Sequence, residues 1–122
     1  MSAERAQSAY GLPKTARLLK PADFVNVLRR PQANFTQGPL RIRAIQNRMP
    51  GARMGLVIGK KGNRTAVRRN RIKRIIRETF RHRTDLNGID IAVQVFGPIE
   101  DQQLRADLEL LLNRVAQRIN AN

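Results

Sequence analysis

Hydrophobic residues recur at a spacing of three and four in three segments of the chain, which predicts three amphipathic helices. The first begins at Pro21, whose fixed φ suits a first turn, and ends before Pro31. The second runs from about Thr65 to about Arg83, and the third follows Gly97-Pro98. The three apolar stripes are Phe24, Val27 and Leu28; Ile72, Ile75, Ile76 and Phe80; and Leu104, Leu108, Leu111, Leu112, Val115 and Ile119.

Segments between these helices carry the patterns of β-strands. Over residues 40–46, Leu40, Ile42 and Ala44 alternate with arginines, and residues 54–58 form a compact apolar run. Apolar residues alternate again over residues 89–95, and Phe96 ends that strand on the opposite face. The order helix, strands, helix, strand, helix predicts an α+β sandwich in which helices cover one sheet.

The composition adds that the chain is strongly basic. It holds 24 Lys and Arg against 9 Asp and Glu, a formal net charge of +15 over 122 residues. A polyanion relieves such self-repulsion, with nucleic acid the first candidate and an anionic membrane surface the second. The absence of Cys excludes disulfides and thiolate chemistry. With no signal peptide or membrane span in view, we expect a cytoplasmic protein, with a flexible tail over residues 1–16 and one RNA-binding domain over residues 17–122.

The second helix carries most of the charge. Placed around a helix at about 100° per residue, its isoleucines and Phe80 face the core, and a row of cations faces the other way. Only Glu78 offsets about nine basic groups between Arg68 and Arg83. Like charges at this spacing destabilise an isolated helix, so the pattern favours phosphate binding over a merely solvated face. The loop that precedes the helix, with Lys60, Lys61 and Gly62, adds a weaker signal for an anion site.

No catalytic constellation is evident. His82 is the single histidine, and the carboxylates form no pair that would hold Mg²⁺. Neither a phosphate-binding glycine loop nor a nucleophile elbow is present. The sequence therefore predicts a binding protein with no catalytic residue and no metal site of its own.

Two runs of the sequence carry a resemblance to a known family. Residues 54–61, Met-Gly-Leu-Val-Ile-Gly-Lys-Lys, and residues 66–78, which contain Arg69-Asn70-Arg71, closely resemble the signature of the bacterial ribonuclease P protein subunit. Residues 17–20 and Asp23-Phe24 resemble the entry to the first helix of that family. The similarity extends from about Arg17 to Arg118.

The resemblance implies a fold, a partner and a reaction. The fold would be an α-β sandwich of the ribosomal protein S5 domain 2-like type, with one small mixed sheet covered by helices and a left-handed β-α-β crossover, against the usual right-handed rule. The partner would be the catalytic RNA of ribonuclease P. The reaction would be endonucleolytic removal of the 5′ leader from precursor tRNA. Mg²⁺ bound by the RNA would do the chemistry, so the protein alone would bind no cofactor.

The resemblance also implies two RNA-binding sites. In the family the arginine-rich helix docks on the catalytic RNA, and a cleft between the first helix and the sheet receives the leader. Leu28 stands where the family often carries a second aromatic residue. The leader cleft would contain Phe24, Leu28 and Ile42. The residues facing the catalytic RNA would be Lys60, Lys61, Arg68, Arg69, Asn70, Arg71, Lys73, Arg74 and Arg77.

Three other functions share the basic charge. A ribosomal protein or general RNA chaperone would be basic and small but would not need the long motif. An architectural DNA-binding protein would prefer duplex DNA, although no helix-turn-helix spacing is evident and no DNA partner is expected. An independent nuclease would cleave precursor tRNA without any RNA subunit.

Overall fold

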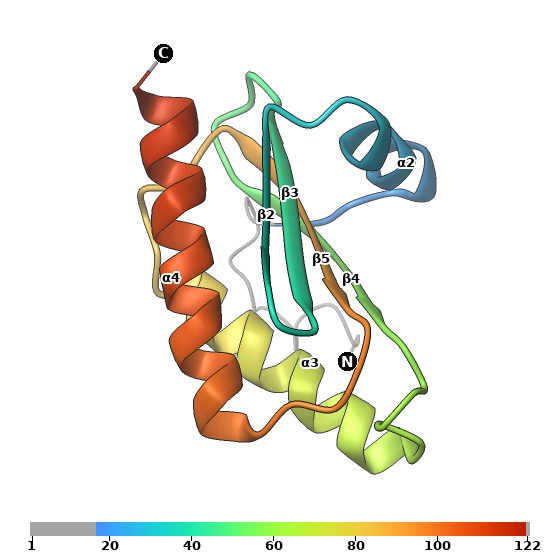
Figure 1. Ribbon diagram of the computed structural model, residues 1–122. Coiled ribbons are helices and arrows are strands. Elements are labelled where there is room, and N and C mark those ends of the chain that lie inside the picture. The colour runs from blue at the N-terminus through green and yellow to red at the C-terminus, as the bar shows by residue number, and fades with distance from the viewer. Residues whose placement is uncertain (1–16, 122) are drawn as a thin grey trace, which may run out of the picture.

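One mixed sheet of five strands forms the centre of the computed structural model, which describes the backbone of residues 17–121 and the side chains from residue 19 onward (Figure 1). The strand order is β1-β4-β5-β3-β2, with β1, β4 and β5 parallel to one another and β3 antiparallel to both β5 and β2. The elements are β1 (Arg17–Leu18), α2 (Pro21–Arg29), β2 (Ala33–Gln37), β3 (Leu40–Gln46), β4 (Arg53–Ile58), α3 (Ala66–Arg81), β5 (Ile89–Val95) and α4 (Asp101–Asn120).

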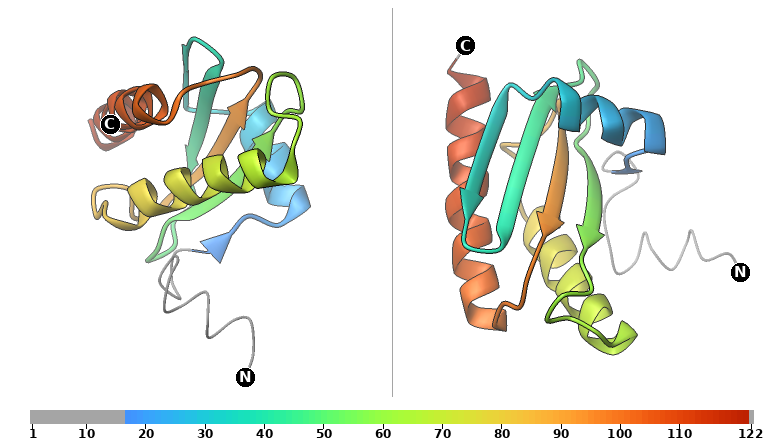
Figure 2. Two further views of the ribbon diagram at one scale, coloured as in Figure 1. Left: turned by 90° about the horizontal axis from the view of Figure 1, so that it is seen from below. Right: turned by 45° about the vertical axis from the view of Figure 1, so that its right-hand side comes forward.

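Helices cover both faces of the sheet, but unequally. Seen from below, α3 and α4 lie on one face and α2 lies on the other (Figure 2, left). The core fills the space between the sheet and the α3–α4 layer, where the predicted apolar stripes of these two helices are buried. Side chains alternate along a strand, so the neighbouring residues of β3, β4 and β5 point to the α2 face.

The strands β4 and β5 are parallel neighbours, and α3 joins them. Followed in the two views of Figure 2, this β4–α3–β5 crossover is left-handed, as the resemblance implies. Nearly all such connections are right-handed, so this one is an exception to the general rule. On its face of the sheet, α3 packs against α4 and the sheet with its isoleucines, and its other long side is open to solvent.

The predicted α3 is confirmed to within two residues at its C-terminal end. Thr65 caps its N-terminus, where the Thr65 hydroxyl accepts a hydrogen bond from the Arg68 backbone N–H at 3.0 Å. Ile72, Ile75, Ile76 and Phe80 are buried, as expected. The chain leaves the helix at His82, where the Arg83 N–H binds the Phe80 carbonyl in a final tight turn.

Two strands were missed from the sequence. β2 has the polar sequence Ala-Asn-Phe-Thr-Gln, and it pairs with β3 through a tight turn in which Gly38 adopts a φ of +56°. β1 has only two residues. The flexible tail expected over residues 1–16 lies outside the described residues. None of the helices within residues 17–121 is long and apolar enough to cross a membrane.

Candidate nucleic-acid interface

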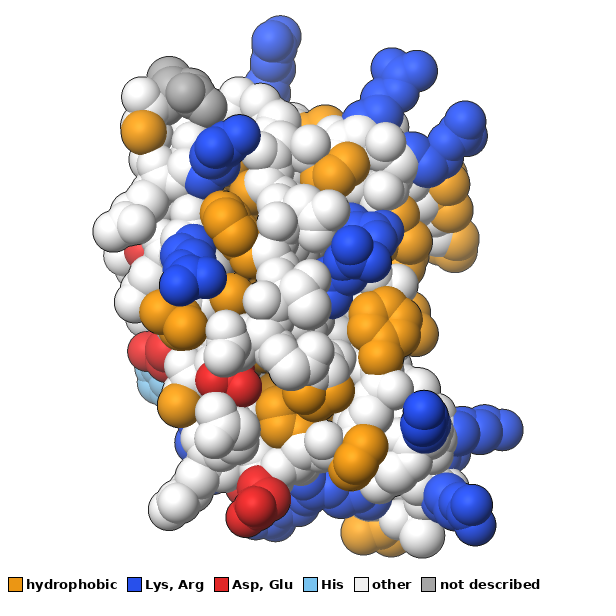
Figure 3. Space-filling model, viewed as in Figure 1, with side chains coloured by type: hydrophobic (Ala, Val, Ile, Leu, Met, Phe, Trp, Pro, Cys, Tyr) orange, Lys and Arg blue, Asp and Glu red, His pale blue; other side chains and the backbone are white. Residues whose placement is uncertain are grey.

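The basic side of α3 faces away from the core, as predicted. Asn70, Arg71 and Arg74 are exposed, and Lys73 and Arg77 are partly exposed. Lys60 and Lys61, in the loop that joins β4 to α3, are exposed as well. Figure 3 shows Lys and Arg side chains gathered at the lower right, over this loop and the start of α3. The two segments together therefore form one basic corner of the molecule.

Two of the predicted RNA-binding arginines are already paired with a carboxylate. The Arg68 Nη1 donates to Asp101 Oδ1 at 2.6 Å, and the Arg71 Nε donates to Asp101 Oδ2 at 2.5 Å. Arg68 also donates through Nη2 to the Ile99 carbonyl. Arg68, and then Arg71, hold the pKa of the Asp101 carboxyl below its usual range. Arg68 thereby connects the N-termini of α3 and α4, whereas Arg71 is 58% exposed.

Arg69 is turned back onto its own loop. Its Nη1 donates to the carbonyls of Asn63 and Arg64, at 2.9 and 2.7 Å. Asn63 is itself buried, with 1% of its surface exposed, and its Nδ2 donates to the Gly97 carbonyl at 2.9 Å. Gly62, with a φ of +75°, lies against the Pro98 ring, which leaves no room for a Cβ atom. The β4–α3 loop is thus joined to the segment that follows β5.

The remaining cations of the basic corner have no partner among the residues that the structure describes. Within residues 19–121, no hydrogen bond or ion pair engages the side-chain charges of a set that spans the loop and one side of α3. That set is Lys60, Lys61, Arg64, Lys73, Arg74 and Arg77. The nearest acidic residue on the helix, Glu78, is engaged by Arg81 and lies 3.3 Å from His82. These unpaired charges of the loop and of α3 are the ones that a phosphate could bind without breaking an ion pair.

Phe24, which the resemblance places in a leader cleft, lies where α2 meets β4. A Cβ atom on Gly55 would come within 2.3 Å of the Phe24 ring, so the ring lies directly on the β4 backbone. The Leu28 carbonyl accepts a hydrogen bond from Arg43 Nη1 at 3.4 Å, and Leu28 is partly exposed. Phe24 and Leu28 therefore both lie where α2 meets the sheet.

The prediction that Ile42 lines this cleft is wrong. Ile42 is fully buried on the opposite face of the sheet, under α3 and α4. Its neighbours Arg41 and Arg43 take the α2 face instead, because side chains alternate along β3. Burial, and then the adjacent Arg41, lower the pKa of Arg43 from its ordinary value. The α2 face of β3 therefore carries two neighbouring cations, Arg41 and Arg43, where one apolar residue was expected.

A buried ion pair below α2 was also missed. Arg53 and Asp90 lie opposite each other on β4 and β5. The Arg53 Nε donates to Asp90 Oδ1 at 2.8 Å, and the Arg53 Nη2 donates to Asp90 Oδ2 at 2.6 Å. The third nitrogen of Arg53 donates to Asp23 of α2 at 3.1 Å, and Asn47 donates to Asp90 at 2.7 Å. This arrangement ties the first turn of α2 to the sheet. In the sequence, the only signal was a single Asp within an apolar strand.

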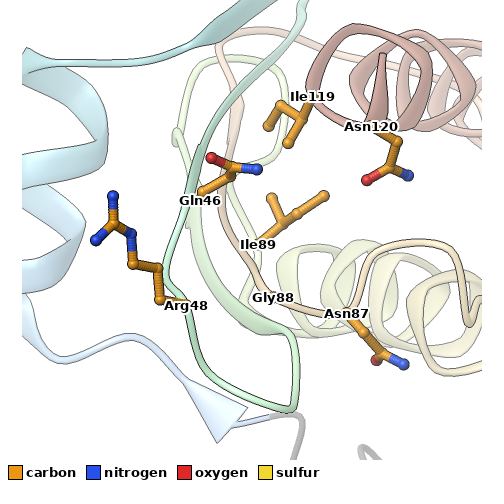
Figure 4. A pocket seen from close by; sticks show the side chains of 7 residues that line it. All are labelled: Gln46, Arg48, Asn87, Gly88, Ile89, Ile119 and Asn120. Carbon is orange, nitrogen blue, oxygen red and sulfur yellow. The ribbon is translucent and has the colours of Figure 1, made fainter. Parts of the chain in front are cut away.

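The described residues form no evident catalytic site. No group of three or more His, Cys, Asp or Glu side chains within residues 19–121 is placed to hold a metal ion. A hollow of about 310 Å³ lies at the other end of the sheet from the basic corner (Figure 4). Its lining residues are Gln46, Arg48, Asn87, Gly88, Ile89, Ile119 and Asn120. This lining contains no carboxylate and no histidine, so it offers no acid or base for a reaction.

The fold and this surface define a class of protein: a small α+β protein with a basic helix turned to solvent, as nucleic-acid-binding proteins have. The family model described as Ribonuclease P matches residues 12–116. The chain belongs to the ribonuclease P protein family, and so is a protein component of ribonuclease P, the ribonucleoprotein that processes the 5′ end of tRNA.

Relatives and solved structures agree with this assignment. The ribonuclease P protein component of Marinobacter nauticus is 42% identical, over 90% of this chain and 86% of its own length. The ribonuclease P protein component of Nitrosomonas europaea is 38% identical, over 88% of this chain and 93% of its own length. The solved RNase P protein of Staphylococcus aureus superposes with a TM-score of 0.73 at 29% identity, over 83% of this chain and 95% of its own. The solved RNase P protein of Thermotoga maritima superposes with a TM-score of 0.66 at 29% identity, over 80% of this chain and 96% of its own.

Proposed function

We propose that this chain binds the catalytic RNA of ribonuclease P through its basic corner, and the 5′ leader of precursor tRNA through the cleft beside α2. The observation that carries the first part is the set of unpaired cations on α3 and its preceding loop. Phosphate contacts by such groups release counterions, so binding should depend steeply on salt. Lys73, Arg74 and Arg77 are the principal contacts, with Asn70 and the outward nitrogens of Arg71 beside them.

Arg68 and Arg69 have a supporting role in this proposal. Their guanidinium groups are held by Asp101 and by the carbonyls of the loop, so they fix the shape of the basic corner. Lys60 and Lys61 extend the contact beyond the end of the helix. The sequence alone did not separate these roles, because all the arginines of α3 carry the same charge.

The proposed leader contact involves Arg41 and Arg43 of β3 together with Phe24 and Leu28 of α2. Arg41 and Arg43 repel each other there, and a phosphate backbone would relieve that repulsion. Phe24 offers an aromatic ring at the junction of α2 and β4. Leu28 replaces a second ring with an aliphatic side chain, which packs against a base but stacks less well.

The chemistry in this proposal belongs to the RNA and its Mg²⁺, in the cytoplasm where precursor tRNA is made. The protein supplies cations that offset phosphate repulsion between the catalytic RNA and its substrate. Reconstituted enzyme should therefore cleave precursor tRNA at a lower Mg²⁺ concentration than the RNA alone. An equal Mg²⁺ requirement with and without the protein would contradict this role.

The test of the RNA-binding surface is a salt titration of ribonuclease P RNA binding. Arg74→Gln should lower the slope of log K against log salt by about 0.7–0.9, the loss of one phosphate contact. Arg114→Gln removes the same charge from the exposed side of α4 and serves as the control, with a smaller change expected. Equal slopes for the Arg74 variant and the unmodified chain would overturn the assignment.

A further inference from the structure

Phe96 presents an aromatic ring at the end of the sheet, away from α2. Its side chain is 51% exposed, and within residues 19–121 it is the only aromatic side chain among the exposed large hydrophobic residues. Phe24 lies over Gly55, which pairs with Ala92 of β5. Phe96 is four residues beyond Ala92, a distance of about 13 Å along the strand. It is therefore separate from the Phe24 cleft but on the same face of the sheet.

The backbone on both sides holds Phe96 in place. Its N–H donates to the Pro39 carbonyl at 2.8 Å, beside the β2–β3 turn. On the other side, the Gly59 N–H donates to the Val95 carbonyl at 2.8 Å. A Cβ atom on Gly59 would come within 3.9 Å of the Phe96 Cα. The ring thus projects from a fixed backbone, so a ligand would not have to order the segment that carries it.

The surroundings of Phe96 combine apolar and cationic groups. Val57, 46% exposed, pairs with Gln94 two residues before Phe96, and Gln94 in turn pairs with Arg41. Lys60 and Lys61 follow Gly59 directly. Figure 3 shows hydrophobic side chains over the lower half of the sheet, next to Lys and Arg side chains where β4 ends. Figure 2 (right) shows that α2 covers only the upper end of this face.

A single exposed hydrophobic residue needs no explanation, because such residues are common on protein surfaces. Here a second apolar side chain and several cations accompany it. Two polar atoms on the same face, Arg41 Nε and Gln94 Oε1, are buried without a hydrogen-bond partner. A flat ring beside cations matches one chemical class, a single-stranded nucleic acid, whose bases stack while its phosphates pair with Lys and Arg.

We propose that Phe96 is a stacking site for an unpaired base of single-stranded RNA, with Val57 beneath the base and Arg41 beside the phosphates. The proposal rests on the function proposed above and extends the RNA-binding face beyond α2. A strand that crosses the sheet would meet two rings on one face, first Phe24 and then Phe96. The second ring makes up for the aliphatic Leu28 in the cleft.

The chain holds no tryptophan, which gives a direct test. Phe96→Trp introduces one reporter at the proposed site, and Met49→Trp introduces the same reporter at the other end of the sheet. The probe is a single-stranded oligoribonucleotide with a leader sequence, labelled so that fluorescence anisotropy reports binding independently. Stacking should quench the emission of the Phe96 variant as anisotropy reaches saturation, and should leave the emission of the Met49 variant unchanged.

A functional test in reconstituted enzyme complements the spectroscopy. Phe96→Ala should weaken binding of leader-bearing precursor tRNA by about five- to a hundredfold, the stacking range converted at tenfold per 1.4 kcal/mol. Phe96→Tyr should bind as the unmodified chain does, and neither variant should change the affinity for mature tRNA.

The outcomes separate this inference from the proposed function. Saturated anisotropy with unquenched Phe96→Trp emission, or full leader affinity in Phe96→Ala, would overturn the stacking site alone. Failure of the unmodified chain to bind ribonuclease P RNA would overturn the proposed function.

Discussion

Asp90 and Arg53 form an ion pair that is largely withdrawn from water on the α2 face of the sheet. Their side chains are 7% and 17% exposed, and they share two hydrogen bonds. The bond to Asp90 is the main reason that the pKa of Arg53 is raised. Asp90→Asn would leave the guanidinium of Arg53 with only the partly exposed Asp23 as counter-charge, so we expect a loss of about 3 kcal/mol in the free energy of unfolding, the lower end of the range for a broken buried ion pair. Urea denaturation with linear extrapolation measures this loss.

The control for this change is a carboxylate that pairs with arginine at the surface. Glu78 of α3 pairs with Arg81, and their side chains are 49% and 33% exposed. Exposed ion pairs contribute little to stability, so Glu78→Gln should shift the urea midpoint only slightly. Similar midpoints for the two variants would show that the Arg53–Asp90 pair is no more than a surface contact in energetic terms.

Gly55 marks the closest approach of α2 to the sheet. A Cβ atom there would lie 2.3 and 2.8 Å from two atoms of the Phe24 ring, closer than van der Waals contact allows. Gly55→Ala should therefore displace α2 and destabilise the fold by about 1–3 kcal/mol, measured by thermal unfolding. Gly97→Ala, whose Cβ would meet Pro39 at an ordinary 3.4 Å, is the matched control. The prediction fails if Gly55→Ala melts no lower than that control.

Single residues were predictable where one local pattern decides their position. Strand alternation predicted the outward position of Phe96. Helical spacing predicted the inward position of the isoleucines of α3. Ile42 was misplaced because the resemblance suggested a cleft while the alternation of β3 places Ile42 in the core. Arg53 and Asp90 are 37 residues apart in sequence, and they pair only because of the register between β4 and β5.

The elements α3 and α4 meet at their N-termini through Asp101. Its pKa in the folded protein is lowered, first by Arg68 and then by Arg71, below the unfolded value of about 3.9. The stabilisation that ionised Asp101 gives by pairing with Arg68 and Arg71 is therefore complete at neutral pH. It is lost as the pH falls through the pKa of Asp101 in the folded protein. Asp101→Asn should be less stable than the unmodified chain at pH 7, with the difference closing in strong acid. Urea midpoints at a series of pH values check this, and a difference that does not depend on pH would contradict it.

Helices were easier to predict than strands in this chain. The long stripes of α3 and α4 repeat over several turns, and Pro21 and Thr65 give clear starting signals. β2 and β1 depend on pairing with β3 and β4, and neither carries a sustained pattern of its own. The left-handed crossover came from the resemblance alone, because general rules of chain connection predict the opposite hand.

The molecule as a whole carries a formal net charge of +15, which destabilises the free protein by self-repulsion. Raising NaCl from about 50 to 300 mM screens this repulsion, because the Debye length falls to below about 10 Å. We expect the Tm of the free protein to rise over this range, in differential scanning calorimetry, while its affinity for RNA falls. A Tm that falls with salt would mean that the exposed ion pairs outweigh the repulsion.

The buried Asn63 side chain, which joins the β4–α3 loop to Gly97, has a consequence for the whole particle. Together with the buried isoleucines of α3, this junction fixes the start of α3 against the end of β5. If the chain binds the catalytic RNA through α3 and the leader through the α2 face, as proposed above, the two RNAs are held at a constant separation, which would set the position of the cleaved bond. Asn63→Ala would leave both binding surfaces chemically intact but let the interval between them vary, so it should blur the position of cleavage more than it weakens binding.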